Sequence, residues 1–143
     1  MIIHCRGGDT EIKRLTREVA EFCASSLMSK RLANSVEVWF HFKHIEGINY
    51  GDCIWEDDDY RPRLFTMDIH WDKDPTKRDY GKVLKTVCHE MVHVSQYAKG
   101  RLALNGKMEY KTQEEYENIW YEKEAYEMEK ILAKSFFQKM FDK

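Results

Sequence analysis

The sequence predicts an α+β fold in which helices pack on a small sheet, within a single domain that spans residues 1–143. Apolar residues recur at three- and four-residue intervals in three segments, and two shorter segments alternate apolar with polar residues. The segments follow one another without repeats or low-complexity tracts, and the chain has only 2 prolines. The expected order is a helix, two or more strands, a helix, a small hairpin and a final helix.

The first predicted helix covers residues 10–28. Asp9 or Thr10 can cap it by accepting hydrogen bonds from the free N–H groups of the first turn. Helical spacing gives this segment one buried face, made of Ile12, Leu15, Val19, Phe22 and Cys23.

Two strands are predicted at residues 36–42 and 64–71, because apolar side chains alternate in both segments. Residues 45–63 between them are predicted to form a loop or an irregular hairpin. They hold Gly47, Gly51 and the acidic run at 56–59, for which a solvated loop is expected. The apolar faces of the two strands consist of Val36, Val38, Phe40 and Phe42, and of Phe65, Met67 and Ile69.

The second half of the chain begins with turn-forming residues at 74–79, followed by a helix over about 78–98 that ends near Gly100. An Asn-Gly pair predicts a hairpin over 102–110. The last predicted helix spans about 113–141, and its apolar stripe is Tyr121, Ala125, Met128, Leu132 and Phe136.

Charge and composition narrow the classes of partner. The net charge of -2 and a pI near 6.3 give no general attraction to nucleic acid or anionic lipid, so nucleic acid is not an expected partner. No apolar run reaches the length of a membrane span, and residues 1–9 lack the layout of a signal peptide, so we expect an intracellular protein. The four scattered cysteines, Cys5, Cys23, Cys53 and Cys88, predict reduced thiols, mostly in the core.

Residues 87–97 read V-C-H-E-M-V-H-V-S-Q-Y, an H-E-x-x-H pattern within the predicted helix. His89 and His93 are four residues apart and therefore project from one helix face, where both can bind one zinc ion. In this pattern the glutamate, Glu90, is the general base that takes a proton from the zinc-bound water. The histidine face lies nearly opposite the expected core stripe, which consists of Leu84, Val87, Met91, Val94 and Ala98.

A catalytic zinc usually has three protein ligands and one position left for water. His4, His41, His44 and His70 all lie upstream of the motif without helpful spacing, and no histidine or cysteine lies downstream. A downstream third ligand must therefore be a carboxylate. Glu122 and Glu124 flank the apolar stripe of the last helix, and spacing alone does not choose between them.

The segments C-H-E-M-V-H-V-S-Q-Y and W-Y-E-K-E-A-Y-E, with a glycine-containing hairpin between them, resemble metallopeptidases of the zincin superfamily, in particular the SprT-like metallopeptidases of phages and bacteria. The similarity covers roughly residues 63–129. In several zincin families the first Glu of an E-x-x-A pattern is the third ligand, which implies Glu122, with Glu124 as the alternative. The resemblance also implies a mixed sheet whose edge strand receives the substrate, and residues 64–71 are the candidate for that edge.

The expected function is therefore that of a zinc metallopeptidase acting on a peptide or protein substrate, in the cytoplasm of a bacterium or of a phage-infected host cell. SprT itself typically has a third histidine and a zinc ribbon; this chain has neither, so a DNA-linked role is not implied. Two alternatives stay open. One is a non-catalytic binding protein on a zincin scaffold, and the other is a structural zinc site that locks the last two helices together.

Several other polar residues have a functional and a more ordinary interpretation. Gln96 can orient a zinc ligand, although such a residue is more often an exposed polar side chain. Asp68 and His70 share a strand face and can line a cleft. Three tyrosines are candidates to stabilise the oxyanion formed on the attacked carbonyl, although packing is the more usual role: Tyr97, Tyr110 and Tyr126.

Overall fold

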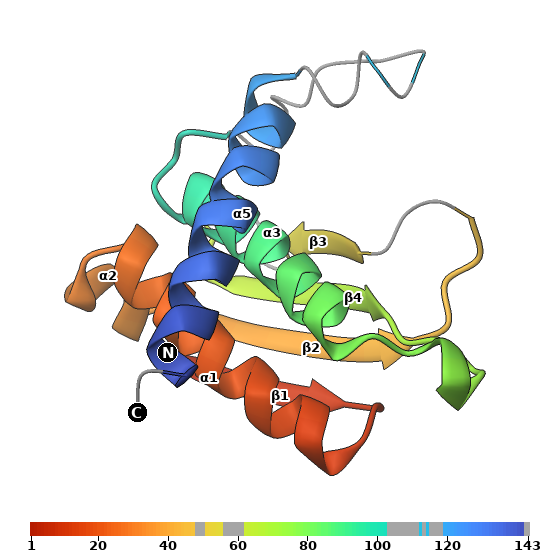
Figure 1. The fold of residues 1–143 in the computed structure, drawn as a ribbon. Helices are drawn as coiled ribbons and strands as arrows, with labels where there is room; N and C mark the ends of the chain where they lie inside the picture. Colours follow the sequence, from red (N-terminus) through yellow and green to blue (C-terminus); the bar gives the residue numbers. More distant parts are fainter. Residues whose placement is uncertain (48–50, 56–61, 103–111, 113, 115–118, 142–143) are drawn as a thin grey trace.

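Four strands form one mixed sheet in the computed structural model, which describes residues 1–47, 51–55, 62–102, 112, 114 and 119–141 (Figure 1). The strand order is β1-β2-β4-β3. The first three strands in this order are parallel, and β3 runs antiparallel to β4. Their bounds are Ile2–Arg6 for β1, Glu37–Lys43 for β2, Gly51–Trp55 for β3 and Leu64–His70 for β4.

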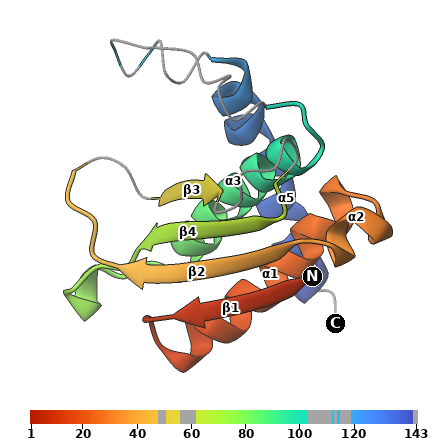
Figure 2. The same ribbon diagram turned by 180° about the vertical axis from the view of Figure 1, so that it is seen from behind.

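Helices cover one face of this sheet. Helices α1 (Thr10–Leu27) and α3 (Tyr80–Ala98) pack side by side against the strands, and α5 (Trp120–Phe141) lies across α3 on the side away from the sheet (Figure 1). The short helix α2 (Lys30–Asn34) leads into β2. Seen from behind, the other face of the sheet carries no helix from the described part of the chain (Figure 2). The α+β class and the three long helices are therefore confirmed.

The sheet corrects one prediction about its edge. Residues 64–71 were expected to form the edge strand that receives a substrate, but β4 lies between β2 and β3. The reason is that residues 51–55, within the predicted loop, pair with β4 from Gly51 opposite Ile69 to Trp55 opposite Phe65. The edges are therefore β3 and β1, and β1 was not predicted at all.

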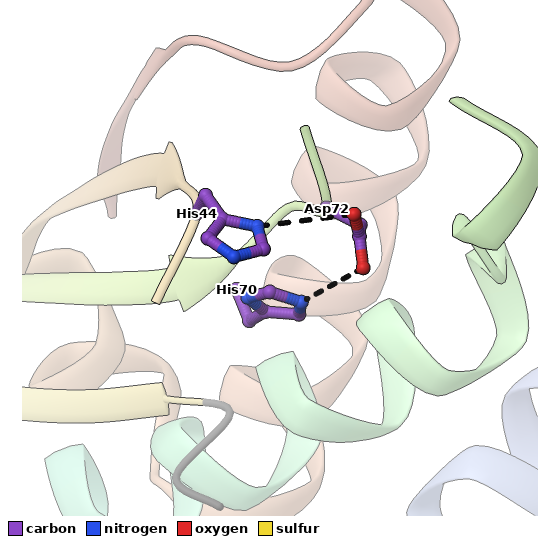
Figure 3. A group of neighbouring side chains, drawn as sticks. All are labelled: His44, His70 and Asp72. Atoms are coloured by element: carbon purple, nitrogen blue, oxygen red, sulfur yellow. Dashed lines mark ion pairs between the residues drawn. The ribbon is translucent and has the colours of Figure 1, made fainter. Parts of the chain in front are cut away.

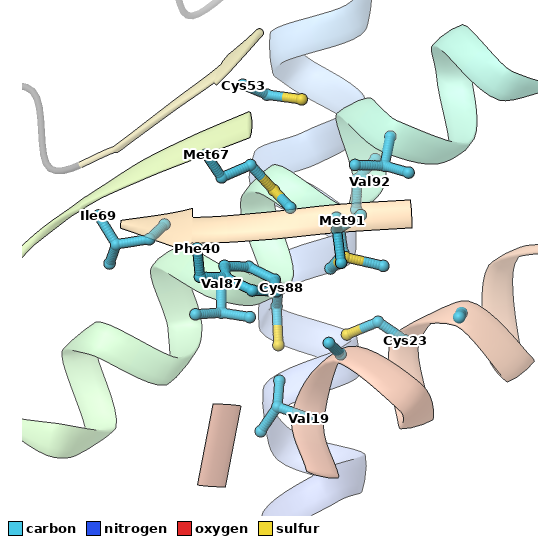
Figure 4. Close-up of a cluster of buried hydrophobic side chains, with 14 of the residues drawn as sticks. Val19, Cys23, Phe40, Cys53, Met67, Ile69, Val87, Cys88, Met91 and Val92 are labelled. Carbon is cyan, nitrogen blue, oxygen red and sulfur yellow. The ribbon is translucent and has the colours of Figure 1, made fainter. Parts of the chain in front are cut away.

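The core lies between the sheet and the two helices that cover it. Figure 4 shows Val19 and Cys23 of α1 and Val87, Cys88 and Met91 of α3 meeting side chains of the sheet. The predicted strand faces are buried: Val38, Phe40, Phe42, Phe65, Met67 and Ile69 are at most 6% exposed. All four cysteines are free thiols; Cys5 is half-buried and the other three are buried, in agreement with the prediction.

Helix ends follow the expected chemistry. Asp9, and not Thr10, caps α1, because its side chain accepts the N–H of Ile12 at 2.7 Å. A short 3₁₀ turn at Pro75–Lys77 precedes α3, and Asp79 caps this helix. The helix ends just before Gly100, whose φ is positive at 75°.

The predicted hairpin and the acidic run at 56–59 lie outside the described residues, apart from Leu102. Within the described part of the chain, none of the helices has the length and hydropathy needed to cross a membrane.

Candidate metal centre

Helix α3 presents the two histidines of the motif to α5 rather than to solvent. The expected core stripe faces the sheet, and each of its five side chains is at most 2% exposed. On the opposite side of α3, His89 is 8% exposed and His93 is 7% exposed, because α5 covers them. Both faces of α3 are therefore buried from Val87 to Ala98, which explains why this part of the helix carries apolar residues well beyond a single stripe.

Glu122, in the first turn of α5, brings a carboxylate between the two imidazoles. Its Oε1 contacts Nε2 of His93, and its Oε2 lies 3.3 Å from Nε2 of His89. The three side chains form a buried group whose ligand atoms all lie within 4.8 Å of one another, close enough to hold one metal ion. Oε2 of Glu122 is buried without a hydrogen bond in the described structure, so it has lone pairs to offer a cation.

Glu124, the alternative ligand, points elsewhere. Its two oxygens form a bidentate pair with Arg101, with both distances 2.8 Å, and Oε1 also accepts from Nε2 of Gln96 at 3.1 Å. Arg101 follows the end of α3, so this pair ties the N-terminal part of α5 to that end. Glu124 is thus a bridge between the two helices, and the structure does not bring it to the histidines.

The outer nitrogens of both histidines face hydrogen-bond acceptors. Nδ1 of His89 lies 3.4 Å from Oε1 of Glu129, and Nδ1 of His93 lies 2.8 Å from Oε1 of Gln96. The amide orientation of Gln96 is fixed because its Nε2 faces two acceptors, the carbonyl of Tyr121 and the carboxylate of Glu124. A ring whose Nδ1 donates its proton leaves the lone pair of Nε2 for a metal, and metal-binding histidines usually have such a partner.

Neither orienting residue was securely identified from the sequence. Gln96, which is more often exposed in such a position, is 0% exposed here. Glu129 was missed altogether. Its position, two helical turns after Glu122 and on the same face of α5, is the signal that could have found it.

The charges of the group are strongly coupled. Burial disfavours an ionised Glu122, but the two imidazoles beside its carboxylate outweigh that effect and hold its pKa far below the ordinary range. Burial likewise disfavours a charged His89, but the carboxylates of Glu122 and Glu129 raise its pKa to about 10. Without metal, the centre therefore contains a protonated imidazole between carboxylates, and a metal ion must displace that proton to bind.

Glu90 lies beside the start of the edge strand β3. It is 4% exposed, and a Cβ atom added to Gly51 would come within 3.1 Å of its Oε1 and 2.7 Å of Cγ2 of Thr86. Only a glycine therefore lets the backbone of β3 approach this part of α3 so closely.

The tyrosine candidates separate into different environments. Tyr97 is 1% exposed and its ring packs 6.2 Å from that of Phe65, which is a core position. The ring of Tyr126 lies 4.7 Å from the ring of His89, at the candidate centre. Tyr110 lies outside the described residues.

Figure 3 shows a second cluster of histidines, at the ends of β2 and β4. Its ring nitrogens accept hydrogen bonds from the backbone, unlike Nδ1 of His89 and His93, which face acceptors. His44, His70 and Asp72 are close enough together to suggest a metal site. However, Nδ1 of His70 accepts the backbone N–H of Ile45 at 3.0 Å, and Nδ1 of His44 accepts that of Lys73 at 3.2 Å. A neutral ring that accepts at Nδ1 carries its proton on Nε2, the atom of His70 that faces Asp72. His70 thus has no lone pair left for an ion, and the cluster does not fit a metal.

No family model, curated protein or solved structure matches the chain. What the centre does must therefore be argued from the geometry of its own residues.

Proposed function

We propose that this protein is a zinc-dependent metallopeptidase that hydrolyses peptide bonds. The observation that carries the proposal is the convergence of His89, His93 and Glu122, with the outer nitrogens of the histidines oriented by Glu129 and Gln96. Two imidazoles and one carboxylate are the ligand set of several catalytic zinc sites. When bound, zinc lowers the pKa of a coordinated water to roughly 7 and polarises a substrate carbonyl.

Each residue around that ion has a separate role in the proposed reaction. The three ligands hold it, and the two orienting side chains fix the planes of the imidazoles. Glu90 takes a proton from the attacking water and passes it to the leaving amine. Among the two described tyrosine candidates, Tyr126, whose ring packs 4.7 Å from that of His89, is the better situated to donate a hydrogen bond to the oxyanion.

The substrate backbone is proposed to pair with the edge strand β3. β4 pairs with one side of this strand, no other described strand pairs with its second side, and its first residue lies against Glu90. An extended peptide added to such an edge gains backbone hydrogen bonds whatever its sequence. The proposal transfers the expected substrate edge from residues 64–71 to Gly51–Trp55.

The number of ligands argues against a purely structural zinc site. Structural sites usually have four protein ligands, whereas the group in the described residues has three. Glu129 does not supply a fourth, because it faces Nδ1 of His89 rather than the common point of the ligands.

Three variants test the proposal when each is compared with the wild-type protein. Glu122→Ala is expected to lose bound zinc, whereas Glu124→Ala should keep it, as measured by the metal content of the purified proteins. Glu90→Gln should keep both zinc and fold but lose cleavage of a peptide library made by digesting a bacterial proteome, with new termini identified by mass spectrometry. Wild-type cleavage rates in Glu90→Gln would refute the mechanism, and a zinc-free wild type would favour a binding protein.

A further inference from the structure

A cavity of about 380 Å³ lies beside the N-terminal half of α3, next to the candidate metal centre. It is bounded by α3, by the turn that precedes this helix, by the end of β4 and by one residue of α5. The lining residues that carry the argument are Lys77, Arg78, Lys82, Lys85, Thr86 and Glu129.

Two contacts connect this cavity to the reacting groups. Glu129 lines the cavity and also lies 3.4 Å from Nδ1 of His89. Thr86 lines it as well, and Thr86 and Glu90 both lie against Gly51 of the edge strand. A peptide held at the centre beside Glu90 therefore has the cavity within reach of the residues next to its scissile bond.

The acidic groups of the lining keep their negative charge, but each is already held by a donor or lies beside an imidazole. Asp72 accepts the N–H of Asp74, Asp79 caps α3, and Glu129 faces His89. The guanidinium group of Arg78 is also engaged, since it donates to the carbonyl of Asp72 and stacks on the ring of Trp71.

The lysines of the lining, in contrast, lack such partners. Within the part of the chain that the structure describes, Lys77, Lys82 and Lys85 form no ion pair within 4.0 Å. The positive end of the α3 dipole adds to their charge, because the cavity lies at the start of that helix. The lining has four basic side chains against three carboxylates, so its net charge is positive and favours an anion: Lys77, Arg78, Lys82 and Lys85 against Asp72, Asp79 and Glu129.

On the basis of the proposed peptidase function, we infer that this cavity is a substrate subsite for a carboxylate, carried by an Asp or Glu side chain next to the scissile bond. Lys82 and Lys85, one turn apart on α3, are the donors. Both lysines are exposed, so water and salt screen their charges, and the selectivity they give is moderate and salt-dependent.

Binding to the zinc-loaded Glu90→Gln protein tests the inference without relying on turnover. The probes are fluorescein-labelled alanine-rich peptides that carry either glutamates or glutamines at the centre, each with an amidated or a free C-terminus, and the readout is fluorescence anisotropy. The glutamate peptide should bind about tenfold more tightly than the glutamine peptide at low salt, and high salt should reduce this difference. The double variant Lys82→Ala/Lys85→Ala should lose most of the difference in affinity between the two peptides. The matched variant Lys30→Ala/Lys134→Ala, which changes two exposed lysines outside the cavity, should keep this difference.

The outcomes separate the subsite from the peptidase function. Equal binding of both peptides, or a preference that survives Lys82→Ala/Lys85→Ala, overturns the subsite. A preference that requires a free C-terminus overturns the side-chain assignment and identifies the carboxylate as the end of the substrate chain. Absence of any cleavage by the wild type in the peptide library refutes the proposed peptidase instead, while the binding comparison still decides the cavity. Zinc content and thermal melting of each variant verify that it has folded.

Discussion

Oε1 of Gln96 lies 2.8 Å from Nδ1 of His93, and the same glutamine donates through Nε2 to the backbone carbonyl of Tyr121 at 3.0 Å. Tyr121 directly precedes Glu122 in α5. The side chain that orients one histidine of the candidate metal centre is therefore itself fixed by the turn that supplies the proposed third ligand. The orientation of His93 therefore depends on the correct docking of α5 on α3.

We expect Gln96→Leu to weaken zinc binding about 10- to 100-fold, because it removes the acceptor of the His93 N–H while keeping a side chain of similar size. A competition titration with a chromophoric chelator measures the affinity. Gln138→Leu, on the exposed side of α5, is the matched control and should bind zinc like the wild type. An unchanged affinity in Gln96→Leu would show that His93 needs no such partner.

Zinc affinity should rise with pH, because the ion must displace a proton from His89, whose pKa in the metal-free protein is raised to about 10. If one proton is displaced, the affinity increases about tenfold per pH unit below that value. Calorimetric titrations in buffers with different ionisation enthalpies count the protons released. An affinity that stays flat from about pH 6 to about pH 8 would contradict the raised pKa.

The raised pKa of His89 should make the metal-free protein less stable as the pH rises, in contrast to its effect on zinc affinity. Because the folded-state pKa of His89 lies above its ordinary value of 6.5, the charged imidazole stabilises the folded state below pH 6.5, and this contribution is lost as the pH rises toward 10. The melting temperature of the chelator-treated protein should therefore fall over this range. His89→Gln should lack this part of the pH dependence.

Gly51→Ala should disturb Glu90, the proposed general base, without removing the proposed metal ligands. The added Cβ would come within 2.7 Å of Cγ2 of Thr86 and 3.1 Å of Oε1 of Glu90, so side chains must shift, at a stability cost of about 1–3 kcal/mol. Cleavage should fall while zinc content stays unchanged. Adding Thr86→Ser to Gly51→Ala removes the methyl group closest to the new Cβ. The double variant should partly recover both stability and cleavage.

Gly81→Ala is the control for that substitution, because the closest atom to its added Cβ is Oδ1 of Asp79 at 3.3 Å. It should leave cleavage unchanged. Equal losses in the Gly51 and Gly81 variants would mean that the approach of β3 to Glu90 has no catalytic importance.

The protein should bind one zinc ion per chain and not two, since neither histidine of the cluster of His44, His70 and Asp72 keeps a free nitrogen lone pair. His70→Ala removes the acceptor of the Ile45 N–H and should cost about 1–3 kcal/mol of stability. Its zinc stoichiometry should equal that of the wild type. A second equivalent in the wild type that disappears in His70→Ala would contradict the tautomer argument.

The sequence predicted the long helices because their apolar residues repeat over many turns. Strand β3 escaped prediction since Gly51 and an acidic neighbour suggest a loop, and only its pairing with β4 explains why those residues are extended. At the metal centre, helical spacing was enough to join His89 with His93. The choice of Glu122 over Glu124 rested on a resemblance, and the structure relates it to a contact that spacing does not contain, the pair of Glu124 with Arg101.

An ion held by His93 of α3 and Glu122 of α5 would also act as a cross-link within the chain. It would close a loop of roughly thirty residues, and closing such a loop lowers the conformational entropy of the chain before any other contact forms. Removing the ion would return that entropy, so α5 would dock on α3 less firmly. Hydrogen exchange of the backbone amides of α5, Trp120–Phe141, would then report metal occupancy directly, before any substrate is identified.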